Sequence, residues 1–199
     1  MNDINEPNEN RRRFLIGATS FVAGAGLVGV ATPFVQSWNP STKARAVGAP
    51  VRVDVSKIES GTMITAEWQG KPVWVLRRTP QNLQSLDKPD HRDKLLDPDS
   101  EVNQQPEYAK KSYRSIRDDI FVAVGVCTHL GCVPNYEPEG MKGVEHALFF
   151  CPCHGSKFDL AGRVFKGVPA PTNLIIPPHQ YLDNSILEIG ADALQSNID

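Results

Sequence analysis

The fold of this chain is decided by two stretches of sequence, Cys127-Thr128-His129-Leu130-Gly131-Cys132 and Cys151-Pro152-Cys153-His154-Gly155-Ser156-Lys157-Phe158-Asp159. Each box holds two cysteines and one histidine, and together they contain all 4 cysteines of the 199-residue chain. Glycines and prolines in and beside the boxes favour tight turns. The boxes therefore predict two loops that wrap one small inorganic group.

Each box offers a mixed pair of ligands, Cys127 with His129 and Cys151 with His154. Two thiolates and two imidazoles suit either zinc or a [2Fe–2S] cluster in which two histidines replace two cysteines on one iron. Zinc fingers usually pair cysteine with cysteine and histidine with histidine, as C-x₂₋₄-C and H-x₃₋₅-H, whereas each pair here is a mixed Cys/His chelate. The mixed pairs favour the cluster, and a structural zinc module is the alternative. The second cysteine of each box could join the loops by a disulfide.

The two boxes resemble the signature of the Rieske iron–sulfur proteins, C-T-H-L-G-C followed by C-P-C-H-G-S. The resemblance covers both boxes without a gap. It implies one [2Fe–2S] cluster per chain and a disulfide between Cys132 and Cys153. The cluster ligands that it implies are Cys127, His129, Cys151 and His154.

The resemblance extends to residues around the cluster. The run from Gly167 to Pro171 resembles the proline loop that covers the cluster in this family, with Val168 inserted. Ser156 matches a serine whose hydroxyl bonds a bridging sulfide, and Leu130 matches an apolar residue that shields the cluster. Phe158 stands where many high-potential members carry a tyrosine, so a very high potential is not expected.

An apolar segment near the N-terminus predicts a membrane anchor. Phe14 to Val35 carries no charge and is long enough to cross a bilayer as a helix; a cleaved signal peptide is the competing interpretation. Arg11 to Arg13 lie directly before it, which predicts a cytoplasmic N-terminus and an exported remainder. Arg11-Arg12-x-Phe14-Leu15 also resembles a twin-arginine export signal. Residues 1–35 are therefore expected to anchor the chain in a bacterial inner membrane, with the following domain periplasmic.

The remainder predicts a linker and one all-β domain. Residues 36–50 are polar and small, which indicates a linker, and the family resemblance implies that this linker is a hinge. From Val51 the pattern alternates as in strands, so residues 51–199 are expected to form an antiparallel β-sandwich whose cluster-binding part covers about 122–171. Apolar runs at 120–126 and 146–150 should deliver the boxes, and further strands are expected at 163–165, 174–176 and 186–189. Residues 79–119 are polar and broken by prolines, which predicts a surface insertion.

Three histidines lie outside the boxes. His91 is expected to be exposed within the insertion, and His179 to be a surface turn residue. His146 is expected on a strand, away from the boxes.

By resemblance, the chain is an iron–sulfur subunit of a quinol–cytochrome c reductase. Quinol would then bond an exposed ligand histidine, His154 rather than His129, and give up one electron with coupled proton transfer. Cytochrome b and cytochrome c1 would be the partner subunits, in a dimeric complex. Two alternatives are the Rieske subunit of another exported oxidoreductase and a soluble Rieske ferredoxin or oxygenase component. A net charge of −2 gives no reason to expect nucleic acid.

Overall fold

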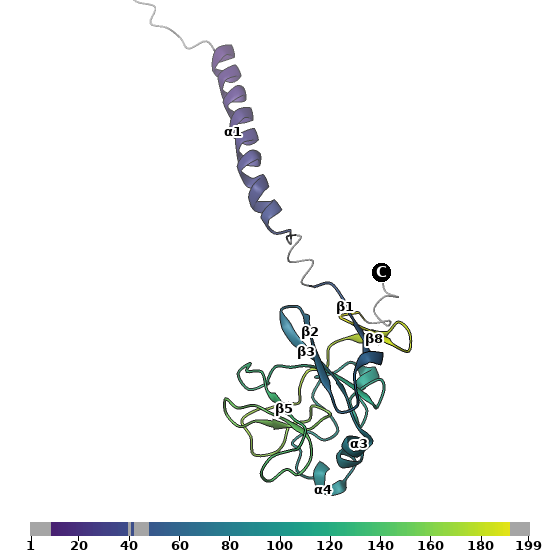
Figure 1. The fold of residues 1–199 in the computed structure, drawn as a ribbon. Helices are drawn as coiled ribbons and strands as arrows, with labels where there is room; N and C mark the ends of the chain where they lie inside the picture. Colours follow the sequence, from purple (N-terminus) through teal and green to yellow (C-terminus); the bar gives the residue numbers. More distant parts are fainter. Residues whose placement is uncertain (1–8, 40, 42–47, 192–199) are drawn as a thin grey trace, which may run out of the picture. The chain divides into compact units, whose positions relative to one another are not determined.

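The computed structural model describes residues 9–39, 41 and 48–191. The chain divides into two compact units, residues 1–46 and 47–199 (Figure 1). About half of the expected hinge, residues 36–50, lies outside the described residues. The division of the chain at 35 and 50 therefore stays a prediction.

The described residues of the first unit form one helix, α1 (Glu9–Ser37), and all of its residues are exposed. Its apolar stretch is long enough to cross a membrane. The hydroxyls of Thr19 and Thr32 donate to carbonyls four residues earlier, both at 2.7 Å, so these polar groups are paired within the helix. A lipid environment requires such internal pairing. The helix is longer than the predicted apolar segment because it continues through the arginines on one side and through Ser37 on the other.

The second unit is built on an antiparallel sheet in the order β2 (Met63–Trp68), β3 (Lys71–Arg77), β4 (Ile120–Val124). Strands β2 and β3 form a hairpin around Gln69 and Gly70, whose φ values of +52° and +69° suit the right-handed twist of the strands. All five residues of β4 are buried. The apolar run at 120–126 therefore forms the predicted buried strand.

Both faces of this sheet are covered. Val73 and Val75 of β3 point to one hydrophobic cluster, which they share with residues of the sheet β1 (Val51–Asp54), β9 (Ile186–Ile189), β8 (His179–Tyr181). Trp74 and Leu76 point to the opposite cluster, which contains Phe149. This alternation follows from the period of two along a strand. Packing on both faces explains why β4 is apolar throughout rather than alternating.

A third antiparallel sheet lies over the second cluster, in the order β5 (Asn135–Glu137), β6 (Leu148–Phe150), β7 (Lys157–Phe158). The predicted all-β, antiparallel class with an N-terminal apolar helix is confirmed. Two predicted strands are wrong: Val164 and Phe165 form isolated bridges only, and residues 174–176 form no strand. The N–H groups of Leu174 and Ile176 donate to two different segments, at Gly162 and Gln104, so no continuous ladder can form.

The connection between β3 and β4 is not the predicted surface insertion. It contains α3 (Pro80–Leu86), α4 (Pro89–Arg92) and the short 3₁₀ helix η2 (Glu107–Ala109). Thr79 precedes α3 and forms a capping box with Asn82. The N–H of Asn82 donates to the Thr79 hydroxyl oxygen, and the N–H of Thr79 donates to the Asn82 side-chain oxygen. Leu86, Leu95 and Arg114 are buried to 2% exposure or less. The connection therefore covers the core around the third sheet.

Candidate metal centre

The two boxes form loops with the same backbone hydrogen bonds. In the first loop the N–H of Cys127 donates to the carbonyl of Cys132 (2.7 Å), and in the second the N–H of Cys151 donates to the carbonyl of Ser156 (2.8 Å). The fifth residue of each loop is a glycine, with φ of +84° and +78°, whose N–H donates back to the carbonyl of the first cysteine. Glycine adopts this left-handed conformation without steric cost. The two loops therefore share the same pattern of backbone hydrogen bonds around a left-handed glycine.

Buried strands hold both loops. Strand β4 leads into the first loop through Gly125 and Val126. Strand β6 ends directly before Cys151, and β7 begins directly after Ser156. The hairpin partners Phe149 and Phe158 are fully buried, so the second loop rests on a packed base.

The thiols of the site are buried, whereas its imidazoles reach solvent. Cys127 and Cys151 are free and buried, at 2% and 1% exposure. His154 is exposed and His129 is partly exposed. Their rings lie edge to face with centroids 4.8 Å apart. The arrangement sets two sulfur donors beneath two imidazoles that reach solvent.

Three contacts tie the loops together. A disulfide joins Cys132 to Cys153, so the implied pairing is confirmed. The N–H of Ala170, in the expected proline loop, donates to the hydroxyl of Ser156 (3.1 Å). The hydroxyl of Thr128 donates to the carbonyl of Thr172 (2.7 Å), just beyond the same loop. Each pair among the three loops is therefore linked once.

The residues fit the group that the boxes imply. The Nδ1 atom of His129 is buried and bonds no group of the described chain, although a buried polar atom normally has a partner. Burial raises the pKa of the Cys151 thiol, with a further rise from the neighbouring Cys127, and a bound cation would favour its ionised form. The unpartnered Nδ1 and the two free thiols fit a site that is completed by metal. The sulfurs of Cys132 and Cys153 are joined in the disulfide, which leaves one free thiol in each box.

Three further predicted residues lie around these loops. Ser156 is fully buried, and its oxygen accepts the bond from Ala170, which leaves its proton available. Phe158 is fully buried in the core cluster with Cys127 and Cys151. Leu130 is 72% exposed at the tip of the first loop. An exposed large apolar residue at this position suits contact with a partner surface.

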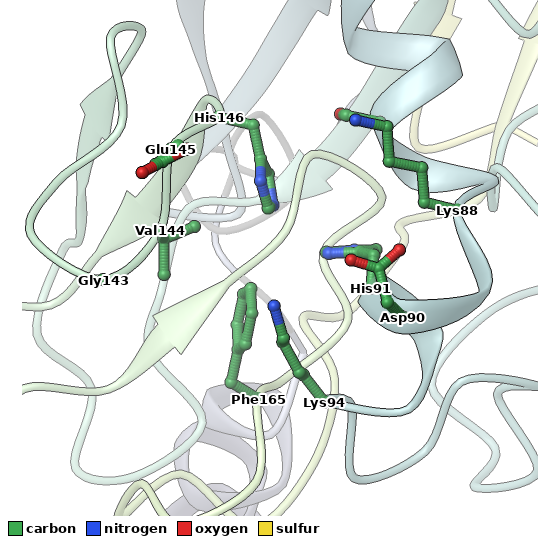
Figure 2. A pocket seen from close by; sticks show the side chains of 10 residues that line it. Lys88, Asp90, His91, Lys94, Gly143, Val144, Glu145, His146 and Phe165 are labelled. Atoms are coloured by element: carbon green, nitrogen blue, oxygen red, sulfur yellow. The ribbon is translucent and has the colours of Figure 1, made fainter.

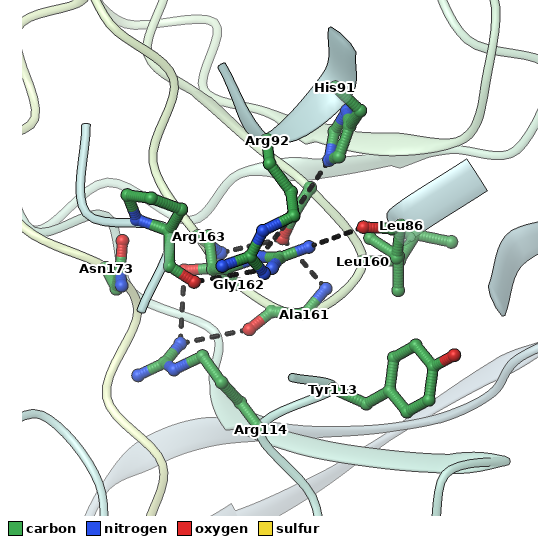
Figure 3. Close-up of polar contacts among 12 residues, drawn as sticks. Leu86, His91, Arg92, Tyr113, Arg114, Leu160, Ala161, Gly162, Arg163 and Asn173 are labelled. Atoms are coloured by element: carbon green, nitrogen blue, oxygen red, sulfur yellow. Dashed lines mark hydrogen bonds and ion pairs between the residues drawn. The ribbon is translucent and has the colours of Figure 1, made fainter. Parts of the chain in front are cut away.

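A buried charged network lies behind the second loop, and the sequence did not indicate it (Figure 3). Arg78, Arg114 and Arg163 are at most 2% exposed. The guanidinium of Arg114 donates to the carbonyls of Ala161 (3.0 Å) and Leu174 (2.8 Å), and burial lowers its pKa to about 10. It is therefore still charged at neutral pH.

Asp159 lies at the centre of this network and is completely buried. One oxygen accepts from the N–H groups of Ala161 and Arg163, and the other from Arg163 Nε (2.7 Å). His91 Nε2 also lies 3.0 Å from that second oxygen. Burial opposes ionisation, but Arg163 and His91 outweigh it and hold the pKa of Asp159 well below its usual range. Asp159 thus fixes the turn that follows β7.

Two predictions for the remaining histidines are wrong. His91 is 2% exposed because Asp159 bonds it inside the core. His179 is also 2% exposed, in β8, where its ring Nδ1 lies 2.8 Å from the carbonyl of Pro177. His146 lies away from both boxes as predicted, although just outside strand β6. The pairing of a histidine with an aspartate 68 residues away leaves no local sequence signal.

The chain is similar in sequence to known proteins. Residues 50–179 match the family described as "Rieske [2Fe-2S] domain", and residues 1–41 match "Ubiquitinol-cytochrome C reductase Fe-S subunit TAT signal". The chain is 52% identical over 189 residues to the ubiquinol-cytochrome c reductase iron-sulfur subunit of Allochromatium vinosum, covering 93% of this chain and 90% of that one. It is 40% identical to the protein of the same name from Blastochloris viridis, covering 91% and 93%. A chain of the solved structure "Hyperthermophilic respiratory Complex III" is 31% identical, with a TM-score of 0.48, covering 86% and 97%.

Proposed function

We propose a function from the premise that this chain belongs to the Rieske [2Fe–2S] family and to the iron–sulfur subunits of ubiquinol–cytochrome c reductase. The function is the transfer of one electron from quinol to a c-type cytochrome within a membrane complex. Cytochrome b and cytochrome c1 are the proposed partner subunits, and the complex is proposed to be dimeric.

The ligands are proposed to be Cys127 and Cys151 on one iron and His129 and His154 on the other. The observation that carries this assignment is the pair of buried free thiols beneath two imidazoles, one of which has a buried, unpartnered Nδ1. When bound, a [2Fe–2S] cluster with this ligand set accepts and returns one electron at a potential of roughly −150 to +300 mV.

The protein's own groups handle the proton. The Nδ1 atom of His129 is buried. With Nδ1 of each histidine proposed as the iron ligand, the Nε2 atom of His154 or His129 is available to a ligand at the surface. His154 is the more exposed of the two and is proposed to bond the quinol hydroxyl and to take its proton. Leu130, the exposed residue that follows His129 in the first loop, is proposed to exclude water when a partner binds.

Two residues adjust the potential. The hydroxyl proton of Ser156 is proposed to bond a cluster sulfide, because its oxygen already accepts from Ala170. Phe158 cannot donate a hydrogen bond, so this position adds nothing to the potential. A moderate potential is therefore expected.

The first unit supports a membrane setting. The matched twin-arginine signal and the exposed apolar helix α1 fit an exported, membrane-anchored subunit. The proposed orientation places the N-terminus in the cytoplasm and the cluster domain in the periplasm, because Arg11 to Arg13 precede the apolar segment. A prefolded domain with its cluster is the kind of cargo that this signal serves.

The experiment that tests this function starts from gently solubilised membranes. Absorption bands of b- and c-type haems should copurify with this chain, together with two irons and two acid-labile sulfides per chain. His154→Gln should abolish quinol-dependent cytochrome c reduction and the reduced cluster's EPR signal, and the exposed Leu182→Ala should leave both unchanged. Purification of the iron-loaded chain without either haem would contradict the proposed complex, and retention of the signal in His154→Gln would contradict the ligand set.

A midpoint measurement tests the proton coupling separately. If a ligand imidazole takes up one proton with each electron, the midpoint should fall by about 59 mV per pH unit in the alkaline range. A midpoint independent of pH throughout would remove the histidines from the proposed role.

A further inference from the structure

A cavity of about 390 Å³ lies on the second unit, away from the candidate metal centre. Helix α4 and the residues after it form one wall, and the segment that leads into β6 forms the other. Figure 2 shows His91 and His146 pointing into this space from the two walls, with Phe165 and Lys94 below them. No cysteine or histidine of the two boxes lines it. It is therefore a separate site.

The His91 ring is oriented by a carboxylate and leaves one nitrogen unused. Its Nε2 lies 3.0 Å from Asp159, which is ionised and can only accept a hydrogen bond. Nε2 therefore holds the proton of the neutral ring, and Nδ1 offers a lone pair. Nδ1 is buried and has no partner among the described residues, in a side chain that is 2% exposed. A histidine that donates one N–H to a carboxylate while its other nitrogen stays open has the arrangement typical of a metal ligand.

His146 supplies a second unpartnered nitrogen. Its Nε2 is also buried and bonds no group of the described chain. The two rings lie edge to face, with centroids 4.8 Å apart and planes at 82°. Zinc bound ~2.0–2.1 Å from two imidazole nitrogens at a tetrahedral angle holds the ring centres roughly 5 Å apart. His129 and His154, the proposed iron ligands, show the same 4.8 Å and 89°.

The charges around the cavity favour a cation ligand over an anion. Burial lowers the pKa of His146, and Lys94 and Lys88 lower it further while Asp159 opposes them, so the neutral ring with its lone pair is favoured. The two lysines alone would favour an anion. A lone pair at His91 Nδ1 repels one, however, and the carboxylate of Asp90 lines the same cavity.

We propose that His91 Nδ1 and His146 Nε2 bind one divalent transition-metal ion of the zinc type. Water completes its coordination. The ion joins the connection between β3 and β4 to the segment between the two boxes. This site is independent of the proposed electron-transfer function, because it uses none of the same residues.

The test counts zinc on the full chain, purified in detergent with its cluster in place. After equilibrium dialysis against micromolar Zn²⁺, the wild-type chain should hold one more zinc than His146→Gln, which should bind at least ~10-fold more weakly at this site. Zinc bound at the exposed cluster histidines is the same in both proteins and cancels. The zinc absorption edge of the wild type should show two imidazole nitrogens at ~2.0–2.1 Å. Iron content and visible absorption of each variant confirm that it is folded.

Two further variants separate the outcomes. His91→Gln should lose the same zinc ion. If His91→Gln fails to fold, His146→Gln still tests the proposal, because the His146 side chain is less buried than that of His91. Lys94→Gln should bind zinc as well or more tightly, because it removes a nearby positive charge. Equal zinc on wild type and His146→Gln would overturn the proposal. Binding of inorganic phosphate that Lys94→Gln abolishes would also overturn it, by showing that the cavity takes anions.

Discussion

Removal of the disulfide is the sharpest test of how the metal centre is held together. Cys132 and Cys153 are separated by 21 positions, so the bond closes a loop of about that length. In the chain-entropy treatment such a loop restricts the unfolded chain by about 3 kcal/mol. For a chain of this size, each kcal/mol corresponds to roughly 2–4 °C in the unfolding midpoint. Cys132→Ser should therefore lower that midpoint by roughly 6–12 °C.

The assay follows the visible circular dichroism of the cluster during heating of the full chain in detergent. Because unfolding with loss of a cluster is irreversible, all variants are compared at one heating rate. Cys153→Ser should lose the same amount as Cys132→Ser, since both remove one bond. The double variant should lose no more than either single variant, because the interaction is shared. It also removes the leftover thiol, which could act as a stray ligand in the single variants.

The two remaining contacts between the loops limit the loss of stability in these variants. The bonds of Thr128 to Thr172 and of Ala170 to Ser156 persist in these variants and contribute about 1 kcal/mol each. A cluster should therefore still assemble, with a shorter lifetime. An unchanged midpoint in Cys132→Ser, or a loss in the double variant equal to the sum of the single losses, would show that the bond does not hold the loops as argued.

Three further predictions follow from buried contacts around the site. Asp159→Asn should cost about 3–5 kcal/mol, because it leaves a buried arginine unpaired. Because the pKa of Asp159 is lowered in the folded state, its ionised form stabilises the fold at pH values above the unfolded-state pKa of ~3.9. This stabilisation is lost as the pH falls below that pKa. The thermal midpoint of Asp159→Asn should therefore depend less on pH in the acid range than that of the wild type. Gly125→Ala should cost about 1–3 kcal/mol in a denaturant titration, because its Cβ would lie 2.3 Å from the buried ring of Trp74; a wild-type titration would mean that the ring can move. Ser156→Ala should lower both the thermal midpoint and the cluster's redox midpoint, measured by voltammetry, whereas the control Thr128→Val should lower the thermal midpoint only; equal redox midpoints in all three proteins would exclude the serine as a donor to the cluster.

The features that could be predicted from the sequence are the local ones. The boxes carry their own turn residues, so the loops follow from the sequence, and the family resemblance indicates which thiols are free and which form the disulfide. The strand at 120–124 could be predicted because a run of apolar residues ending at a glycine has few other structures. Gln69 and Gly70 likewise mark the hairpin between β2 and β3.

The features that could not be predicted depend on distant partners. A polar, proline-broken segment normally lies in solvent. Nothing near His91 or Arg114 in the sequence indicates that they form hydrogen bonds in the core, His91 with Asp159 and Arg114 with the carbonyl of Ala161. The expected strand at 174–176 failed for the same reason, since its N–H groups bond two segments that are remote in sequence. A polar side chain is buried only together with its hydrogen-bond partner, and a local sequence pattern shows the side chain but not a partner that is distant in sequence.

These misjudged residues explain how the site can be rigid at its base and open at its tip. Behind the second loop, Arg78 donates to the carbonyl of Leu160 (3.1 Å) and Arg114 to that of Ala161, so two guanidiniums hold the turn that Asp159 caps. Such buried charges add little net stability, but each one is unsatisfied in any other arrangement of the turn, which favours a single geometry. At the tip, His154 and Leu130 are exposed, and neither side chain forms a hydrogen bond within the described chain that would have to break before a partner binds. The proposed function, in which the chain takes an electron from quinol at an exposed imidazole and passes it to a cytochrome, needs both properties, a fixed metal geometry below and an unoccupied surface above. The connection between β3 and β4 supplies the first of them, and therefore belongs to the functional core of the domain.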